Sequence, residues 1–288
     1  MSRRGWTYFG AMALIWGIPY LLIRIAVRQL DPGVLVLART APVALLLSPI
    51  VCARHQWTVL WRNLRWIAVF GVVEFGVPWY LMATSEKHIT SSLTSLLICT
   101  VPLLSVVAQR IRRTDGHIAR RRYVGLAVGA LGVGFLVGLD LRGGSLTWIA
   151  LMMVVCVGYT VGPIVLATKL RDVAGVTVVM GATAVVAVGW VPWDVAHWPH
   201  HVSNETWLCI AVLSIVCTAG AFLVFFELIK AVGTTRATVV TYVNTAIAVV
   251  LGIIGLHEPL TVGIGVGFPL VIVGSIVATG APREPVLA

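Results

Sequence analysis

The sequence predicts an all-α integral membrane protein of ten transmembrane helices, arranged as two inverted five-helix repeats. Three observations lead to this prediction: the composition, the spacing of the apolar segments and the distribution of basic residues. Apolar residues make up 59% of the 288 residues and charged residues 11%, against roughly 45–50% and 25% in soluble domains. A soluble fold of this length cannot cover so much apolar surface, whereas lipid tails can.

The apolar segments divide the chain into ten spans. A membrane-crossing helix needs about 20 apolar residues, and helices are expected because they satisfy their own backbone groups in lipid. The expected spans are Trp6–Val27, Gly33–Cys52, Trp66–Thr84, Ser91–Gln109, Tyr123–Leu139, Leu146–Ala167, Val173–Val191, Trp207–Ile229, Ala237–Leu256 and Leu260–Thr279. These spans and their short connections use the whole length, so no separate soluble domain is expected.

The basic residues predict the orientation of these spans, since Lys and Arg collect in cytoplasmic loops. One side of the membrane has sixteen of them: Arg3, Arg4, Arg54, Arg62, Arg65, Arg110, Arg112, Arg113, Arg120, Arg121, Arg122, Lys169, Arg171, Lys230, Arg236 and Arg283. The other side has Arg28, Lys87 and Arg142, and Arg24 and Arg39 lie inside spans. The protein is therefore expected in the plasma membrane (the bacterial inner membrane), with both termini on the cytoplasmic side. The net charge of +10 is interpreted as this orientation signal, and no nucleic-acid partner is expected.

An internal repeat supports the division into halves. With an offset of about 143 residues, the polar segment 90–95 aligns with the segment 233–238, and Lys87 aligns with Lys230. We expect one repeat over residues 1–142 and the second over 143–288. Because each half has an odd number of spans, the second half must be inverted relative to the first. Inverted repeats are a recurrent architecture of transporters, in which the binding site lies near the midplane between the halves.

Several short segments resemble those of a known family. They are Ile15-Trp16-Gly17, Leu37-Ala38-Arg39, the Thr/Ser-rich start of the fourth span, Val232-Gly233-Thr234-Thr235-Arg236-Ala237 with Tyr242, and His257-Glu258-Pro259-Leu260-Thr261 with Gly267 and Gly274. In order and spacing they resemble the drug/metabolite transporter superfamily, and within it the EamA-type ten-helix permeases. The resemblance implies a secondary transporter that moves a small metabolite or an amphipathic drug-like compound by alternating access. The resemblance includes amino acids and related metabolites among the implied cargoes, and it implies that transport is directed out of the cell.

Four charged residues lie inside the expected spans, where each costs roughly 2.5–3.5 kcal/mol on insertion scales. Arg24 is close enough to the end of its span to reach the interface, and Glu227 is spaced for a helix ion pair with Lys230. Arg39 and Glu74 lie deeper. We expect Glu74 to be a proton-linked site, with Arg39 as its partner or as an anchor for an anionic group of the cargo. The alternative is a buried pair that only fixes packing.

Other candidate substrate-binding residues are aromatic or hydroxylated side chains near the middle of spans. They are Trp16, Tyr20, Ser95, Tyr159, Thr238 and Tyr242. All of these except Thr238 are expected to line one central volume together with Glu74. Prolines within six spans would free backbone carbonyls beside some of them. Packing by the aromatic residues, and hydrogen bonds between helices by the hydroxyls, are equally open alternatives.

The sequence has no motif for a cofactor, a metal or a familiar hydrolase. It contains no Walker motif, no HExxH and no GxSxG, and its cysteines form no CxxC pair. A metal site built by Asp194, His197, His200 and His201 is a minor alternative. The remaining alternatives are a membrane enzyme acting on a lipid-linked substrate and a non-transporting membrane subunit. The expected partners are a small-molecule substrate and membrane lipids, with a homodimer as one possible assembly.

Overall fold

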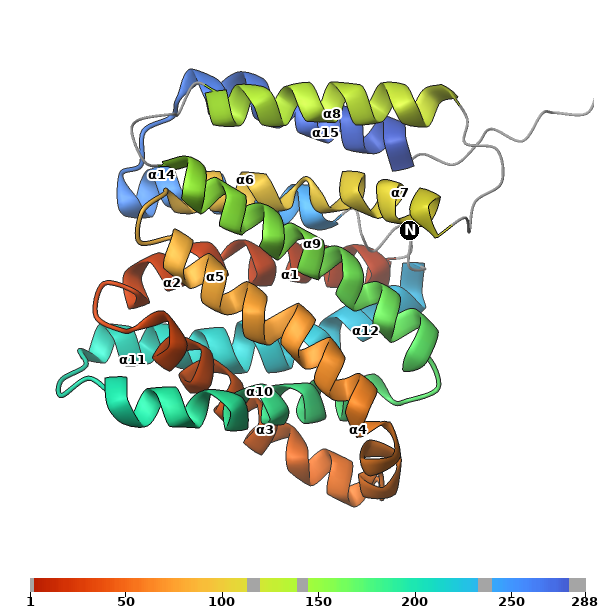
Figure 1. The fold of residues 1–288 in the computed structure, drawn as a ribbon, viewed down its shortest axis with the longest axis vertical. Coiled ribbons are helices and arrows are strands. Elements are labelled where there is room, and N and C mark those ends of the chain that lie inside the picture. The colour runs from red at the N-terminus through yellow and green to blue at the C-terminus, as the bar shows by residue number, and fades with distance from the viewer. Residues whose placement is uncertain (1–2, 113–119, 139–144, 233–239, 280–288) are drawn as a thin grey trace, which may run out of the picture.

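The computed structural model describes residues 3–112, 120–138, 145–232 and 240–279, and these residues form helices and no strand (Figure 1). The first span is divided into α1 (Arg3–Gly17) and α2 (Pro19–Ala26), and the second is α3 (Pro32–Ala53). The third consists of α4 (Trp57–Gly71), the π-helical segment η1 (Val72–Gly76) and α5 (Val77–Ser85). The fourth is divided into α6 (Ser91–Ile98) and α7 (Val101–Ile111), and the fifth is α8 (Arg120–Gly138).

The second half follows the same plan. Its first two spans are α9 (Ser145–Lys169) and α10 (Gly175–His197). Its third combines α11 (Asn204–Ala211), a second π-helical segment η2 (Val212–Gly220) and α12 (Ala221–Val232). The last two are α14 (Val240–Leu256) and α15 (Val262–Thr279). The third span of each half is thus interrupted by a π-helical segment.

The described helices agree with the ten expected spans. Seven of them are long and apolar enough to cross a membrane, and three more are shorter apolar helices. The expectation was wrong at two ends. The third span begins at Trp57 instead of Trp66, because Arg62 and Arg65 lower the apolar content of its first turns without ending the helix. The seventh continues to His197, past Pro192, instead of ending at Val191.

The prolines interrupt fewer spans than the sequence suggests. α2 begins at Pro19, and Pro78 and Pro102 are the second residues of α5 and α7, so each of these prolines lies in the first turn of a helical segment. In contrast, α3, α9 and α15 continue through Pro42, Pro163 and Pro269. Proline removes one hydrogen bond to the preceding turn, and these three helices continue despite that loss.

Helices from the two halves pack on each other reciprocally. The first helix of the first half, α1, contacts α14, and the first helix of the second half, α9, contacts α6 and α7. The second spans, α3 and α10, pair with each other, as do the fifth spans, α8 and α15 (Figure 1). A pseudo-two-fold relation between two halves produces this exchange of partners.

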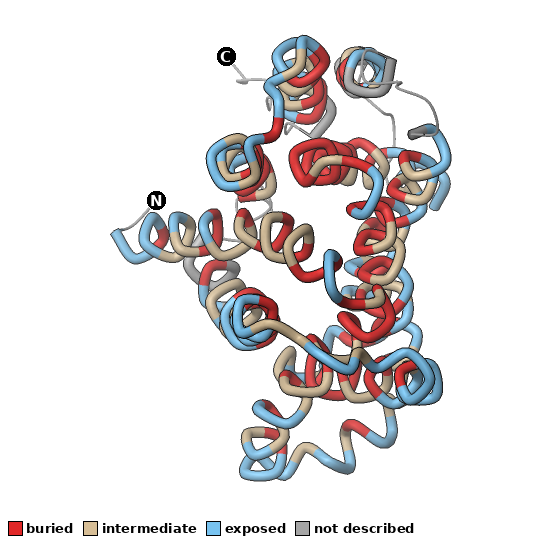
Figure 2. Tube along the Cα trace, turned by 90° about the vertical axis from the view of Figure 1, so that its left-hand side faces the viewer, coloured by how far each residue is buried: buried red, intermediate tan, exposed pale blue. Residues whose placement is uncertain are grey.

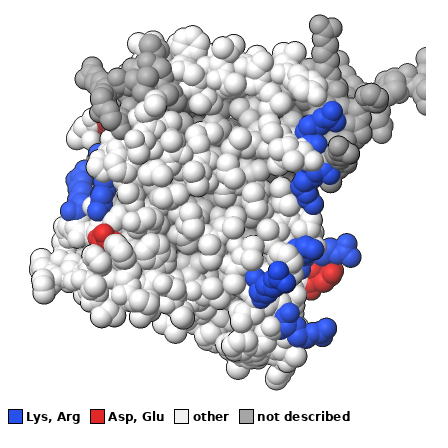
Figure 3. Space-filling view, in the orientation of Figure 1, with Lys and Arg blue, Asp and Glu red and all other residues white. Residues whose placement is uncertain are grey.

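The surface is apolar where the helices face outward. Large side chains such as Leu45, Ile111 and Ile254 are at least 70% exposed, and Figure 2 shows exposed residues along the outward sides of the helices. In Figure 3 an uncharged belt separates a small group of basic residues at one end from a larger group at the other. A belt of this kind fits the hydrocarbon layer of a membrane.

Candidate functional site

Arg39 lies about two turns from the start of α3 and is buried, with 6% of its surface exposed. Its Nε donates a hydrogen bond of 3.1 Å to Oγ1 of Thr218. Its Cζ lies 3.5 Å from the centre of the Trp79 ring, within the range of a cation–π contact. The guanidinium is therefore held by one hydroxyl and one aromatic face, both of them neutral.

Thr218 occupies this position because of the π-helical segment η2. Its Oγ1 donates to the carbonyl of Leu213, five residues earlier, at 2.8 Å. A hydroxyl has one hydrogen and two lone pairs, so the same oxygen also accepts from Arg39. Ser214 lies in η2, four residues before Thr218. Its hydroxyl lies 3.3 Å from the carbonyl oxygen of Ala38 and so connects η2 to α3. π-helical segments frequently mark functional sites, and here one orients the acceptor for a buried cation.

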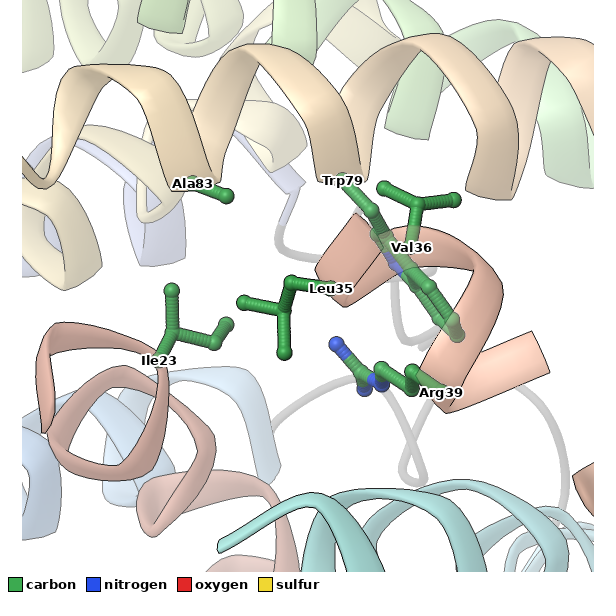
Figure 4. Close-up of a pocket in the computed structure, with 6 residues that line it drawn as sticks. All are labelled: Ile23, Leu35, Val36, Arg39, Trp79 and Ala83. Carbon is green, nitrogen blue, oxygen red and sulfur yellow. The ribbon is translucent and has the colours of Figure 1, made fainter. Parts of the chain in front are cut away.

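Arg39 and Trp79 line a small cavity together with Ile23, Leu35, Val36 and Ala83. Figure 4 shows the guanidinium beside the Trp79 ring. The cavity has a volume of about 10 Å³, which is room for a single water molecule. In this conformation the site is therefore closed to an organic molecule.

Arg39 forms no ion pair with a carboxylate in the described part of the chain. Tyr20, Tyr159 and Glu86 interact with it only electrostatically. A guanidinium has five N–H donors in a planar fork that matches a carboxylate or a phosphate. The arrangement suits the recognition of an anionic group of a ligand.

Glu74 lies in η1 and does not pair with Arg39, so this part of the sequence expectation is not met. Its Oε2 is buried and makes no hydrogen bond with a described residue. The carboxyl packs against Gly162 of α9, where a side chain on residue 162 would collide with it. Tyr159, one turn before Gly162, interacts electrostatically with Glu74 and with Arg39. The two charged residues therefore share a neighbour without touching.

The other expected site residues divide into two groups. Tyr20 is buried and interacts electrostatically with Tyr159, so these two lie around Arg39. Trp16 instead packs against Phe222 and Phe225 of α12.

Two of the three polar candidates of the repeated fourth spans lie in the described part of the chain. Ser95 donates to the carbonyl of Ser92 within its own helix at 2.8 Å. Tyr242 is buried in the apolar core, and Thr238 lies outside the described residues. Among the described candidates, Arg39 alone lines this closed cavity, and the expectation of one central volume stays a prediction.

Four residues near Arg39 were missed by the sequence analysis. Thr218 and Ser214 are spaced four residues apart in an otherwise apolar span, a polar face that would have indicated Thr218. Trp79 gave no signal, because aromatic residues are common in apolar spans. Glu86 was assigned to a loop, although it is fully buried and both of its carboxylate oxygens lack a hydrogen-bond partner among the described residues.

A second polar contact joins the two halves. Glu258, which follows α14, accepts hydrogen bonds from the backbone N–H groups of Ser91 and Ser92 at 2.8 and 3.0 Å. It also accepts from the Ser92 hydroxyl at 2.6 Å. These N–H groups belong to the first turn of α6, whose unpaired donors and positive dipole end favour a carboxylate. Glu258 of the second half therefore caps a helix of the first.

The minor metal-site alternative finds no support in the described ranges. They contain no group of three or more His, Cys, Asp or Glu side chains placed to hold a metal ion. His197 instead stacks on Trp193, with ring centres 4.1 Å apart.

Comparison with known proteins places the chain in a family. The model of the EamA-like transporter family matches residues 3–138 and again residues 146–280. The uncharacterized inner membrane transporter YedA of Escherichia coli (strain K12) is 25% identical over 251 residues, which cover 84% of this chain and 79% of YedA. YedA of Escherichia coli O157:H7 matches with the same values.

A solved crystal structure shares the fold. It covers 96% of both chains with a TM-score of 0.68 at 17% sequence identity. The family model matches once in each half and accounts for nearly all of the sequence, in agreement with the reciprocal packing of two five-span halves. This protein is therefore a multi-pass membrane transporter that belongs to the EamA-like transporter family.

Proposed function

We propose that this transporter is a secondary transporter that moves a small organic molecule with an anionic group, and that Arg39 binds this group. The observation that supports the proposal is a buried guanidinium without a carboxylate partner in the described residues. A charge in a span is costly, and a purely structural arginine would be expected to have a counter-ion. Arg39 has Thr218 and Trp79 instead, which leaves its remaining donors for a ligand.

The surroundings of Arg39 indicate the rest of the cargo. Trp79 and Tyr20 place aromatic surface beside the guanidinium, which suits a compound with an apolar part next to its anionic group. Amino acids and related amphipathic metabolites have this chemistry. The direction that we propose is export, with both termini in the cytoplasm.

Transport by alternating access requires the site to open. A cavity of about 10 Å³ cannot hold such a cargo, so the helices around it must separate during the cycle. The site draws residues from α3 and α5 in one half and from η2 in the other. Movement of one half against the other would therefore open it, as in other inverted-repeat transporters.

A flux screen in proteoliposomes tests the proposal. Small amphipathic carboxylates, including amino acids, are compared with their neutral amides, with and without a proton gradient. We expect flux of at least one carboxylate and much slower flux of its amide, because the amide offers Arg39 no negative charge. Equal flux of acid and amide would contradict the role of Arg39, and absence of any flux alongside hydrolysis of a lipid-linked substrate would overturn the transporter mechanism.

Glu74 is the proposed proton-linked residue, and Glu74→Gln tests it. Gln imitates the protonated acid, so the variant should fold and bind cargo but lose accumulation driven by the proton gradient. We expect flux down the cargo gradient to continue while gradient-driven flux falls to the level of empty liposomes. The control is Glu205→Gln, which changes an exposed carboxyl in the first turn of α11. Wild-type accumulation with normal pH dependence in Glu74→Gln would show that Glu74 is not the proton site.

A further inference from the structure

A second, larger cavity lies at the end of the molecule where α2 and α5 end. It has a volume of about 170 Å³ and is lined by Arg24, Val27, Arg28 and Lys87. We call it the cationic pocket. Three of its four lining residues carry a positive charge, and the small basic group at one end of Figure 3 marks this end of the molecule.

The charges of the cationic pocket are not neutralised by direct contacts. The side chains of Arg24, Arg28 and Lys87 make no hydrogen bond or ion pair with another residue of the described ranges. One carboxylate, Glu86, is fully buried and interacts electrostatically with Arg24. Because the pocket has three cations and one neighbouring carboxylate, the electrostatic potential inside it is positive. Protein walls of low dielectric constant strengthen this potential.

The position of these basic residues is unusual for the chain. The charge bias of the sequence assigns this end to the side with few Lys and Arg, so orientation of the spans gives no reason for a basic cluster here. Arg28 and Lys87 are two of the three loop cations expected on that side, and Arg24 is at the end of its span. Although they come from separate segments, they surround one cavity.

The cationic pocket lies next to the cavity at Arg39, since residues close in sequence line the two. On α2, Ile23 lines the inner cavity, and Arg24 and Val27 line the outer one. Ile23 and Val27 are one helical turn apart at the end of α2, or about 6 Å. After α5, Lys87 lines the outer cavity, four residues beyond Ala83 of the inner one. Glu86 lies between them and interacts electrostatically with both Arg24 and Arg39.

We propose that the cationic pocket is a docking site for the anionic group of the transported molecule, at the mouth of the path to Arg39. This inference rests on the proposed function and extends it to a second site. The ligand class is a carboxylate or phosphate group on a small organic molecule. The volume is smaller than the roughly 300–1,000 Å³ of a site for a whole drug-sized ligand, which suits docking of an anionic group alone. An anion released by Arg39 would meet three further cations about one helical turn away.

Thiol reactivity tests the potential in the pocket without any cargo. Val27 is only 6% exposed but lines the pocket, so Val27→Cys places a thiol at its wall and retains all three cations. A Cys52→Ser background removes the exposed native cysteine, and the remaining four are buried and do not line the pocket. Purified protein in nanodiscs of phosphatidylcholine is treated with methanethiosulfonate reagents of similar size, one anionic and one cationic. The matched control is Val195→Cys on α10, a position that is 80% exposed and outside the pocket.

We expect the anionic reagent to be favoured at position 27 by about tenfold relative to position 195. Adding Arg24→Gln and Arg28→Gln should remove most of this preference. Succinate or inorganic phosphate should slow the reaction at position 27 and leave position 195 unchanged. Equal preference at both positions, or no reaction at position 27 with either reagent, would overturn the proposal, since the pocket would then attract or admit no small anion.

A second arm separates a soluble anion from a lipid headgroup. The reaction at position 27 is repeated in nanodiscs that contain phosphatidylglycerol. Protection by succinate or phosphate at the same level in both lipids supports docking of a soluble anion. Protection by phosphatidylglycerol alone would make the pocket a lipid site and overturn the proposal. A charge preference at position 27 in a protein that moves no carboxylate would refute the proposed function and leave anion docking in place.

Discussion

Arg39→Gln is expected to weaken binding of the transported anion by about tenfold to a hundredfold, with a corresponding loss of transport at low cargo concentration. Hydrogen bonds that involve a charged group contribute about 1.5–3 kcal/mol, and every 1.4 kcal/mol is about a factor of ten. Arg39→Lys should give an intermediate loss, because Lys keeps the charge but lacks the planar fork that contacts both oxygens of a carboxylate. The measurement is the concentration dependence of flux in proteoliposomes.

The control for this variant is Arg54→Gln, which removes an exposed arginine at the end of the same helix, α3. Thr218→Val provides a second test, because it leaves the Arg39 Nε without its acceptor and should raise the half-saturating concentration while the charge remains. Each of these variants must elute as folded protein in size-exclusion chromatography before its flux is compared with that of the wild type. Wild-type affinity for an anionic cargo in folded Arg39→Gln protein would refute the assignment.

Glu258→Ala is expected to cause the largest loss of stability. The change leaves the backbone N–H groups of Ser91 and Ser92 without an acceptor in a buried position, at about 1–3 kcal/mol for each unsatisfied donor. Glu258→Gln retains an acceptor but removes the charge at the start of α6, a smaller loss of about 0.3–2 kcal/mol. The midpoint of thermal unfolding in detergent should fall in the order wild type, Gln, Ala.

Gly252 supplies an independent test of the same cap. A methyl group at this position would lie 2.5 Å from Oε2 of Glu258 and 2.5 Å from the Ser92 hydroxyl. Gly252→Ala should therefore displace the cap and lower the unfolding midpoint without changing any polar group. Glu205→Gln, at an exposed first-turn position of α11, is the matched control and should have little effect. If Glu258→Ala unfolds at the wild-type temperature, the cap does not contribute to stability.

The sequence predicted the fold well because the membrane imposes a simple rule on helices. Apolar length decides where a span lies, and the helices agree with most expected bounds to within a few residues. The start of the third span was missed for a physical reason. In a hydropathy pattern, Arg62 and Arg65 indicate a loop. Arginine side chains near a helix end can, however, extend to the membrane–water interface while the helix continues.

The site was predicted less completely, because its contacts depend on which helices meet. Arg39 could be singled out, since a charge deep in a span is costly. Its partners could not be identified, because Thr218 lies 179 residues away and Trp79 is an ordinary apolar-span residue. The depth of Glu74 and Arg39 suggested a pair, but depth does not fix the face of a helix, and the two side chains do not form an ion pair.

The π-helical segments also determine how this family should be compared position by position. A π turn contains about one residue more than the α turn it replaces, so every residue after it is rotated by about 100° around the helix axis. A helical wheel drawn at a constant 3.6 residues per turn through Trp57–Ser85 therefore assigns Trp79 and Ala83 to the wrong face. In an alignment, a one-residue gap within 72–76 or 212–220 therefore indicates that the residues after it are rotated about the helix axis, and does not simply indicate a shorter helix. Relatives that differ there would direct different side chains at the same cargo, even where their sequences after the gap are identical.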